Sequence, residues 1–356
     1  MGPPAAIAER SRSPKMNDTA SGKGKAYAPF GQQVARVLKG YLTSDEVREL
    51  HRPRPALHLA VAARHLLLTL LIGLAAWKLA SPWFWVPLAL LQGFQILGFI
   101  ILLHEWVHDA IFARPHPGWM RLLGWLYALP STISASQFAR WHMDHHYELG
   151  TTGDDPKRAY LTPKIVTRWY KLLYLTPALF VIYSIGSNRE ARRYPASLRR
   201  KIVFERAGNV LLHAGLVAAL WKLGSFDAAF RVHLAPLFLA FPIAFTMNRL
   251  GQHYDIDPRD PLQWSTLVGS HPVWNFVYLW SNFHLEHHYY PRVPFYRLAE
   301  LHRRLQPLYR DRGMRPRGYG EIFWNWFVRN RTPHTNWFEG PERLAPAPDS
   351  SGPPRG

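Results

Sequence analysis

The chain of 356 residues has 43 Lys and Arg against 24 Asp and Glu, yet 48% of its residues are hydrophobic and 14% are aromatic. The absence of cysteine excludes disulfides, cysteine-bound zinc and an iron–sulfur cluster held by the chain itself. The formal charge of +19 does not indicate a nucleic-acid partner, because Lys and Arg flank long apolar runs, as on the basic face of a membrane protein.

The N-terminal third of the chain predicts a tail followed by a membrane hairpin. Residues 1–30 are rich in Pro, Gly, Ser, Lys and Arg without an apolar core, so we expect a disordered basic tail and not a signal peptide. Apolar stretches at about 57–80 and 83–103 are each long enough to span a bilayer. The turn at Ser81-Pro82 joins them, and the second span runs directly into His104.

Two histidine clusters lie in the next part of the chain. They are His104-x-x-x-His108 and His142-x-x-His145-His146. Residues three and four apart share one face of a helix, so each cluster directs its imidazoles towards one place. Residues 119–129 between the clusters are apolar but too short to cross a bilayer, and we expect them at the membrane interface.

A second hairpin is predicted by apolar stretches at about 207–224 and 230–247. The stretch 172–185 that precedes it contains 14 residues and is broken by Pro177. If that stretch crossed the membrane alone, the histidine clusters before and after it would face opposite sides. We therefore expect it at the interface, which leaves four spans with both termini on the cytoplasmic side.

The remaining histidines that follow a pattern are His253, just after the fourth span, and the cluster His284-Leu-Glu-His287-His288. Neutral imidazole binds iron, zinc, copper and nickel, and nine ligands are too many for one ion but suit two. The sequence thus predicts an all-α integral membrane protein in which one domain, 31–338, carries four transmembrane helices in two hairpins and a cytoplasmic helical cap that holds the clusters. A disordered Pro-rich tail is expected over 339–356. The predicted metal ligands are His104, His108, His142, His145, His146, His253, His284, His287 and His288.

With these clusters and hairpins in this order, the stretch from about Leu57 to Leu305 resembles the integral-membrane fatty-acid desaturase and hydroxylase superfamily. The resemblance includes the motif from Asn282 to Pro291, Asn-Phe-His-Leu-Glu-His-His-Tyr-Tyr-Pro. It implies two non-haem irons, and dioxygen used to attack a C–H bond of a lipid chain. It also implies that His253 binds metal, with Asn248 as a weaker candidate acting through water.

The resemblance implies further partners for the site. The third cluster begins with His284 where members with a fused cytochrome b5 domain have Gln, so the expected electron donor is external, a ferredoxin or a separate cytochrome b5. Carboxylates are expected to orient the ring nitrogens that face away from metal. The candidates for that role are Asp109, Asp144, Asp255 and Glu286.

Two alternatives to a fatty-acyl or acyl-lipid desaturase remain open. A lipid hydroxylase or a carotenoid ketolase of the same superfamily shares the histidine clusters, although Tyr289-Tyr290-Pro291 is more typical of acyl desaturases. His104-Glu105-x-x-His108 also matches the H-E-x-x-H pattern of zinc proteases, with Glu105 as the general base. That protease alternative leaves the other seven patterned histidines unexplained. It also predicts that Glu105→Gln abolishes activity, whereas a desaturase should tolerate the change.

Overall fold

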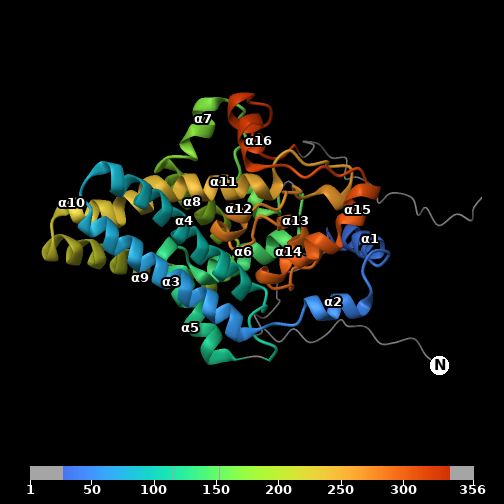
Figure 1. The fold of residues 1–356 in the computed structure, drawn as a ribbon, viewed down its shortest axis with the longest axis horizontal. Helices are drawn as coiled ribbons and strands as arrows, with labels where there is room; N and C mark the ends of the chain where they lie inside the picture. Colours follow the sequence, from blue (N-terminus) through green and yellow to red (C-terminus); the bar gives the residue numbers. More distant parts are fainter. Residues whose placement is uncertain (1–26, 115, 152, 337–356) are drawn as a thin grey trace, which may run out of the picture.

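The computed structural model describes residues 27–114, 116–151 and 153–336, and no β-strand forms among them. Figure 1 shows long helices on the left and a cap of short helices on the right. The predicted tail over 339–356 and residues 1–26 of the predicted N-terminal tail lie outside the described residues. Helix α1 begins at Ala28, inside the tail predicted over 1–30.

Four helices are long and apolar enough to cross a membrane: α3 (Pro55–Lys78), α4 (Pro82–Val107), α9 (Ala196–Leu223) and the continuous helix Phe226–His253. The last consists of α10 (Phe226–Ala229), π-helical turns at Phe230–Leu234 and Pro236–Ala240, and α11 (Phe241–His253). These helices form the two predicted hairpins. Their ends differ from the predicted spans because a helix continues beyond its apolar part: α4 carries His104 on its last turn, α11 ends at His253, and α9 begins in basic sequence at Ala196.

The remaining helices are short, and most of them build the cap. None of them is among the membrane-spanning candidates, and this includes the apolar segments of α5 and α8 that we expected at the interface. They are α1 (Ala28–Leu38), α2 (Ser44–Leu50), α5 (Pro117–Ala128), α6 (Ala135–Tyr147), α7 (Arg168–Leu173), α8 (Ala178–Ala191), α12 (Pro272–Val277), α13 (His284–Tyr289), α14 (Phe295–Arg304), α15 (Gln306–Asp311) and α16 (Tyr319–Phe323). Further 3-10 or π turns lie at Leu129–Ser131, Lys157–Leu161, Pro261–Gln263 and Trp324–Val328.

Burial distinguishes the inner membrane-spanning helices from the outer ones. Most of the apolar part of α4 and of the fourth membrane-spanning helix is buried, whereas α3 and α9 are largely exposed. On α3 the exposed side chains include Leu67, Leu70 and Leu74, and on α9 they include Leu211. A helix surface of leucines that nothing in the protein covers is what a lipid-facing helix presents. The core therefore lies along α4, which carries His104 on its last turn, and α11, which ends at His253.

Hydrogen bonds from α9 fix the start of α6, the helix that carries the second histidine cluster. Ser134 caps α6 by accepting a hydrogen bond from the Gln137 backbone N–H. The Glu205 carboxylate accepts hydrogen bonds from the hydroxyl of Ser134 at 2.5 Å and from the hydroxyl of Ser136 at 2.6 Å. A carboxylate at a helix N-terminus is favourable because the orphan N–H groups carry partial positive charge. The contact holds α6 across the cap-side end of the bundle.

Candidate metal centre

All nine predicted ligands come together at the cap-side ends of α4 and α11, and they separate into two compact groups. Within each group the possible ligand atoms all lie within 4.8 Å of one another. The first group contains His104, His108, His142, His146 and His287, and the second contains His145, His253, His284 and His288. The predicted gathering of the clusters is therefore what the structure shows.

The two adjacent histidine pairs, His145-His146 and His287-His288, each divide between the groups. On α6, His146 lies one turn after His142 and joins it in the first group, whereas His145 points to the second. On α13, His284 and His288 lie one turn apart and share the second group, whereas His287 joins the first. The pattern His-x-x-His-His suits this arrangement because the i and i+4 residues share a face and the i+3 residue lies beside them. Each cluster thus contributes to both groups.

In the first group the imidazoles face one another through Nε2 atoms. The Nε2 of His142 lies 2.8 Å from that of His108 and 3.1 Å from that of His146, and the Nε2 atoms of His146 and His287 are 3.0 Å apart. The His104 ring lies 4.2 Å from the His287 ring between centroids, and its buried Nε2 has no hydrogen-bond partner. A buried ring nitrogen without a partner is costly unless something else binds it.

In the second group the contacts also join Nε2 atoms. The Nε2 of His253 is 3.1 Å from that of His145 and 3.2 Å from that of His284, which in turn is 3.2 Å from the Nε2 of His288. Imidazole nitrogens bind a divalent ion at about 2.1 Å, so two ligands at right angles around one ion lie about 3 Å apart. The observed spacings in both groups match that value. The residues present therefore fit two metal ions, one in each group.

Two histidines of the second group have their other nitrogen held by a protein acceptor. His145 Nδ1 lies 2.8 Å from a carboxylate oxygen of Asp155, and His253 Nδ1 lies 2.8 Å from the backbone carbonyl oxygen of Trp264. With the proton on Nδ1, each ring directs the lone pair of Nε2 into the group. Such partners fix the tautomer and orientation of metal-binding histidines.

Asp155 is itself held in place by the loop that contains it. Its carboxylate accepts hydrogen bonds from the backbone N–H groups of Gly150, Lys157 and Arg158, while the hydroxyl of Thr151 accepts one from its N–H. Burial raises the pKa of the Asp155 carboxyl to about 6. Asp155 was not among the carboxylates expected from the sequence. The one signal for its role was an acidic residue in the turn 153–156 that follows α6.

Burial also sets the protonation state of the ligands. It holds the pKa values of the histidines that lie outside the membrane-spanning helices well below the ordinary value, with neighbouring histidines and cations adding to the effect. These imidazoles are neutral near pH 7, which is the form that binds metal. The residues concerned are His108, His142, His145, His146, His284, His287 and His288.

Two of the four carboxylates proposed to orient the ligands bond arginines. Asp144 bonds Arg140 at 2.9 Å, and Asp255 bonds Arg317 at 2.9 Å. Each of these side chains lies within reach of a cation.

Of the other two candidates, Glu286 contacts residues other than the predicted ligands. Glu286 is fully buried, and it bonds His302 at 2.5 Å and the hydroxyl of Tyr309 at 2.6 Å, neither of which is a predicted ligand. It therefore joins α13 to α14 and α15. Asp109 follows His108 with a φ of 51°, so the backbone turns sharply where α4 ends.

A chain of polar side chains lies beside the second group. The buried Lys157 donates a hydrogen bond from Nζ to the Gln252 amide oxygen at 3.2 Å, and Gln252 donates to the Asn248 amide oxygen at 3.1 Å. Asn248 donates to the hydroxyl of Ser281 at 2.9 Å. Both amide atoms of Asn248, the weaker candidate for binding metal through water, are therefore engaged within the protein. Sequence analysis missed Lys157, whose pKa burial lowers well below its ordinary value.

Glu105 lies between the first group and the cap. One of its carboxylate oxygens accepts a hydrogen bond of 2.9 Å from the backbone N–H of Phe295, at the start of α14, and the other is 3.6 Å from His104 Nδ1. The side chain is buried. Its position suits a carboxylate that joins α4 to α14 better than a base that activates water on a metal.

Comparisons with known proteins agree with this geometry. The family model described as fatty acid desaturase matches residues 80–320. The chain is 26% identical over 317 residues to a sphingolipid delta(4)-desaturase/C4-monooxygenase from Homo sapiens, covering 83% of this chain and 87% of that protein. It is 23% identical over 261 residues to an sn-1 oleoyl-lipid 12-desaturase from Anabaena variabilis, covering 68% of this chain and 62% of that protein.

Proposed function

The chain belongs to the fatty acid desaturase family, and on that premise we propose that it is a di-iron, dioxygen-dependent desaturase of lipid acyl chains. The observation that carries this proposal is the division of nine histidines, eight of them buried, into two groups, each with neighbouring ring nitrogens about 3 Å apart. Nine nitrogen ligands without a thiolate suit first-row metals such as iron. A pair of irons supplies the oxidising power that an unactivated methylene requires.

The residues of this chain have three tasks in that reaction. The nine histidines would hold the metals through neutral imidazoles, and Asp155 and the Trp264 carbonyl would keep His145 and His253 in the ligand tautomer. The buried surroundings exclude water from the centre, which protects a strong oxidant from side reactions. We nominate no general acid or base.

The reaction needs an electron donor that can reach the site from one side of the membrane. Each turnover that removes two hydrogens and reduces dioxygen to two waters takes up two electrons from a donor and two protons from the solvent. The chain has no cysteine for a cluster of its own, so we propose an external donor, a ferredoxin or a cytochrome b5. Its basic segments between the apolar runs suit an acidic donor and a cytoplasmic location of both termini and the site.

Hydroxylation is the second candidate function. The relative from Homo sapiens carries both activities in its name, desaturase and monooxygenase, and both reactions begin by removing one hydrogen from a methylene. A carotenoid ketolase is a less favoured alternative, because the two relatives named above act on sphingolipid or acyl lipid. The zinc-protease alternative is disfavoured, since His104 and His108 lie in a group of five histidines and Glu105 bonds a backbone N–H.

Lipid analysis tests the proposed reaction. The chain and its His287→Ala variant are expressed in a host with the electron donor, and perdeuterated fatty acids are supplied. We expect acyl chains that have lost two deuteriums and gained one double bond, only with the unaltered protein. A hydroxylated product would favour the second candidate. An unchanged lipid profile from protein that retains its metals would contradict both.

A further inference from the structure

We propose that α7 and the chain from Tyr319 to Val328, here called the α7–α16 arm, rest in the membrane interface with Trp169 and Trp324 in contact with lipid. The arm includes α16 and the π-helical turn Trp324–Val328. The seating of the arm on the bilayer does not depend on which reaction the histidines perform.

Cations on α7 point into the arm. Lys171 is fully buried, and its Nζ donates a hydrogen bond of 2.6 Å to the backbone carbonyl of Trp326. Arg168 donates to the carbonyls of Phe327 at 3.2 Å and Val328 at 2.7 Å. These carbonyls end a helical segment and lack partners within it, so positive groups are favourable there. Arg168 and Lys171 thus join α7 to the chain that follows α16.

Large apolar side chains of the same arm point outwards. Trp169, between those two cations in sequence, is 81% exposed, and Trp324 is 53% exposed. Ile165, Leu173 and Val328 are exposed around them. A fully buried lysine beside an exposed tryptophan reverses the usual arrangement of a water-soluble protein. Such an arrangement is expected where the outer surface faces lipid.

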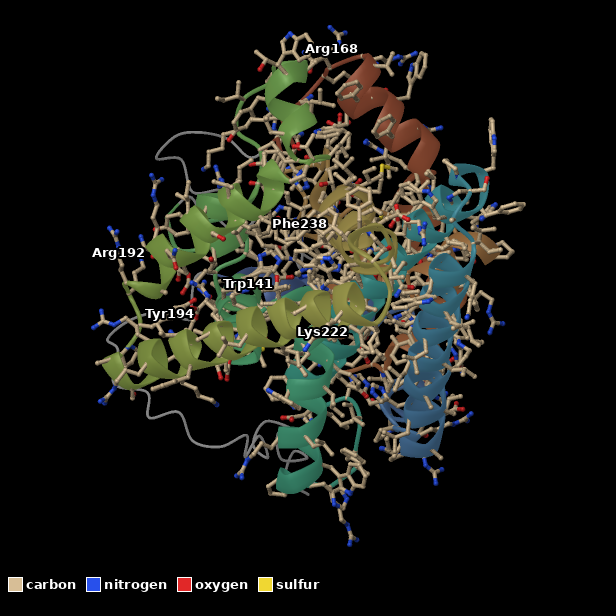
Figure 2. All side chains as sticks on the ribbon, turned by 90° about the vertical axis from the view of Figure 1, so that its left-hand side faces the viewer. Trp141, Arg168, Arg192, Tyr194, Lys222 and Phe238 are labelled. Atoms are coloured by element: carbon tan, nitrogen blue, oxygen red, sulfur yellow. The ribbon has the colours of Figure 1, made fainter. Side chains whose placement is uncertain are left out.

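The position of the arm indicates which part of the bilayer it meets. In Figures 1 and 2 α7 and α16 lie side by side and project from the body at the top. Figure 2 shows Arg168 at the outer tip of α7. In Figure 1 they lie nearer the cap than the turn between α3 and α4 at the left. Tryptophan concentrates where the hydrocarbon meets the headgroups, since its ring has an apolar body and one N–H donor.

Neighbouring surfaces continue the apolar face of the arm. On α8, which follows α7 in the chain, Val181 and Ile185 are exposed, and on the fourth membrane-spanning helix Phe238 and Leu239 are exposed. The ring of Phe180 on α8 lies 5.2 Å from that of Phe238 between centroids, so α8 packs against the fourth membrane-spanning helix. Because α8 follows α7 in the chain and adjoins a helix that must face lipid, we assign the arm to the same bilayer and not to a second protein.

Seating the arm on lipid would support the helix that ends at His253. Tyr319, the first residue of α16, packs against Gly251 of α11 so closely that a Cβ at Gly251 would lie 2.5 Å from the tyrosine oxygen. The hydroxyl of Thr246 on α11 donates a hydrogen bond of 2.6 Å to the Tyr174 carbonyl just after α7. Tyr319 of the arm thus contacts the last turn of α11, and the residue that follows α7 bonds the middle of that helix.

Single cysteines can test the seating directly, because the chain has none of its own. Trp169→Cys and Trp324→Cys are each labelled with an environment-sensitive fluorophore, and the full-length protein is placed in phosphatidylcholine nanodiscs. Quenching by lipids with a spin label on the acyl chain is compared with quenching by aqueous iodide. Leu211→Cys on the exposed face of α9 serves as the lipid control, and Arg303→Cys on the exposed side of α14 as the water control.

We expect labels at 169 and 324 to be quenched by the spin-labelled lipid nearly as strongly as at 211, with iodide quenching several-fold weaker than at 303. The proposal is overturned if both labels behave like the one at 303. Neither result depends on iron or turnover, so a failure here is distinguishable from a failure of the proposed reaction. Trp169→Phe with the label at 324 serves as a second variant if the first substitution prevents folding.

Discussion

The Nδ1 atom of His145 lies 2.8 Å from the carboxylate of Asp155, and both side chains are buried. The Asp155 carboxylate in turn accepts hydrogen bonds from the backbone N–H groups of Gly150, Lys157 and Arg158. The His145 ring of the second group is therefore oriented by a residue ten positions after it in the chain, and this residue lies in a turn and not in a helix.

This contact predicts the effect of Asp155→Asn. The amide keeps an oxygen that can accept the His145 proton but loses the charge, so we expect metal affinity of the second group to fall by about 10- to 100-fold. The measurement is metal content after dialysis against a graded chelator series. Asp154→Asn is the matched control, because that side chain is about half exposed. Equal metal retention in the two variants would contradict the assignment.

The two groups should lose metal independently. His253→Ala removes a ligand of the second group only, and His104→Ala removes one of the first only. We expect each variant to bind close to one metal ion per chain tightly, because the remaining group keeps its full set of nitrogens. Elemental analysis of detergent-purified protein measures this. If either substitution released both ions together, the division into two separate groups would be wrong.

Glu105→Gln should leave metal content and lipid turnover largely intact. The amide oxygen of Gln can still accept the hydrogen bond from the Phe295 N–H. Glu105→Ala removes that acceptor and leaves a buried N–H unpaired, which costs about 1–3 kcal/mol of stability. Thermal unfolding and lipid analysis of both variants test the assignment. Abolition of turnover by Glu105→Gln, with metal retained, would instead favour a catalytic carboxylate.

Metal-depleted protein should lose stability as the pH falls from 7 to 5. Burial depresses the folded-state pKa of seven ligand histidines below the unfolded value of about 6.5. Unfolding then takes up protons below about pH 6.5, at about 1.4 kcal/mol per pH unit for each such group. Asp155 opposes this, because its pKa is raised to about 6 in the folded state and its stabilising protonation grows as the pH falls.

The seven histidines outnumber the one carboxyl, so we expect the free energy of unfolding to decrease as the pH falls from 7 to 5. Thermal melts in detergent at a series of pH values measure it, with chelator present throughout. A melting temperature that stays level or rises between pH 7 and pH 5 would show that the buried histidines are already protonated in the folded protein.

Helical spacing was enough to predict which histidines meet, because residues such as His142 and His146 must share a face of any helix they occupy. It could not predict how the adjacent pairs divide, since that depends on how α6 and α13 face each other. The partner of His253 was also beyond sequence analysis: the acceptor is the backbone carbonyl of Trp264, and every residue carries a carbonyl. Asp144 and Asp255 were chosen by sequence proximity, but each bonds an arginine.

The bounds of the membrane-spanning helices show a similar limit. Apolar composition located all four, but helices continue where hydropathy falls. The fourth was predicted to end at 247, whereas α11 continues to His253. That extra length places His253 beside His145 and His284. The predicted helix end was short, and the role of His253 as a metal ligand stays a prediction.

The metal content of the purified protein tests the central claim most directly. Elemental analysis of protein reconstituted with iron should give close to two irons per chain, falling to about one in His253→Ala and in His104→Ala. One zinc per chain, dependent on His104 and His108 but indifferent to His287, would contradict the proposed di-iron centre and favour the zinc-protease alternative.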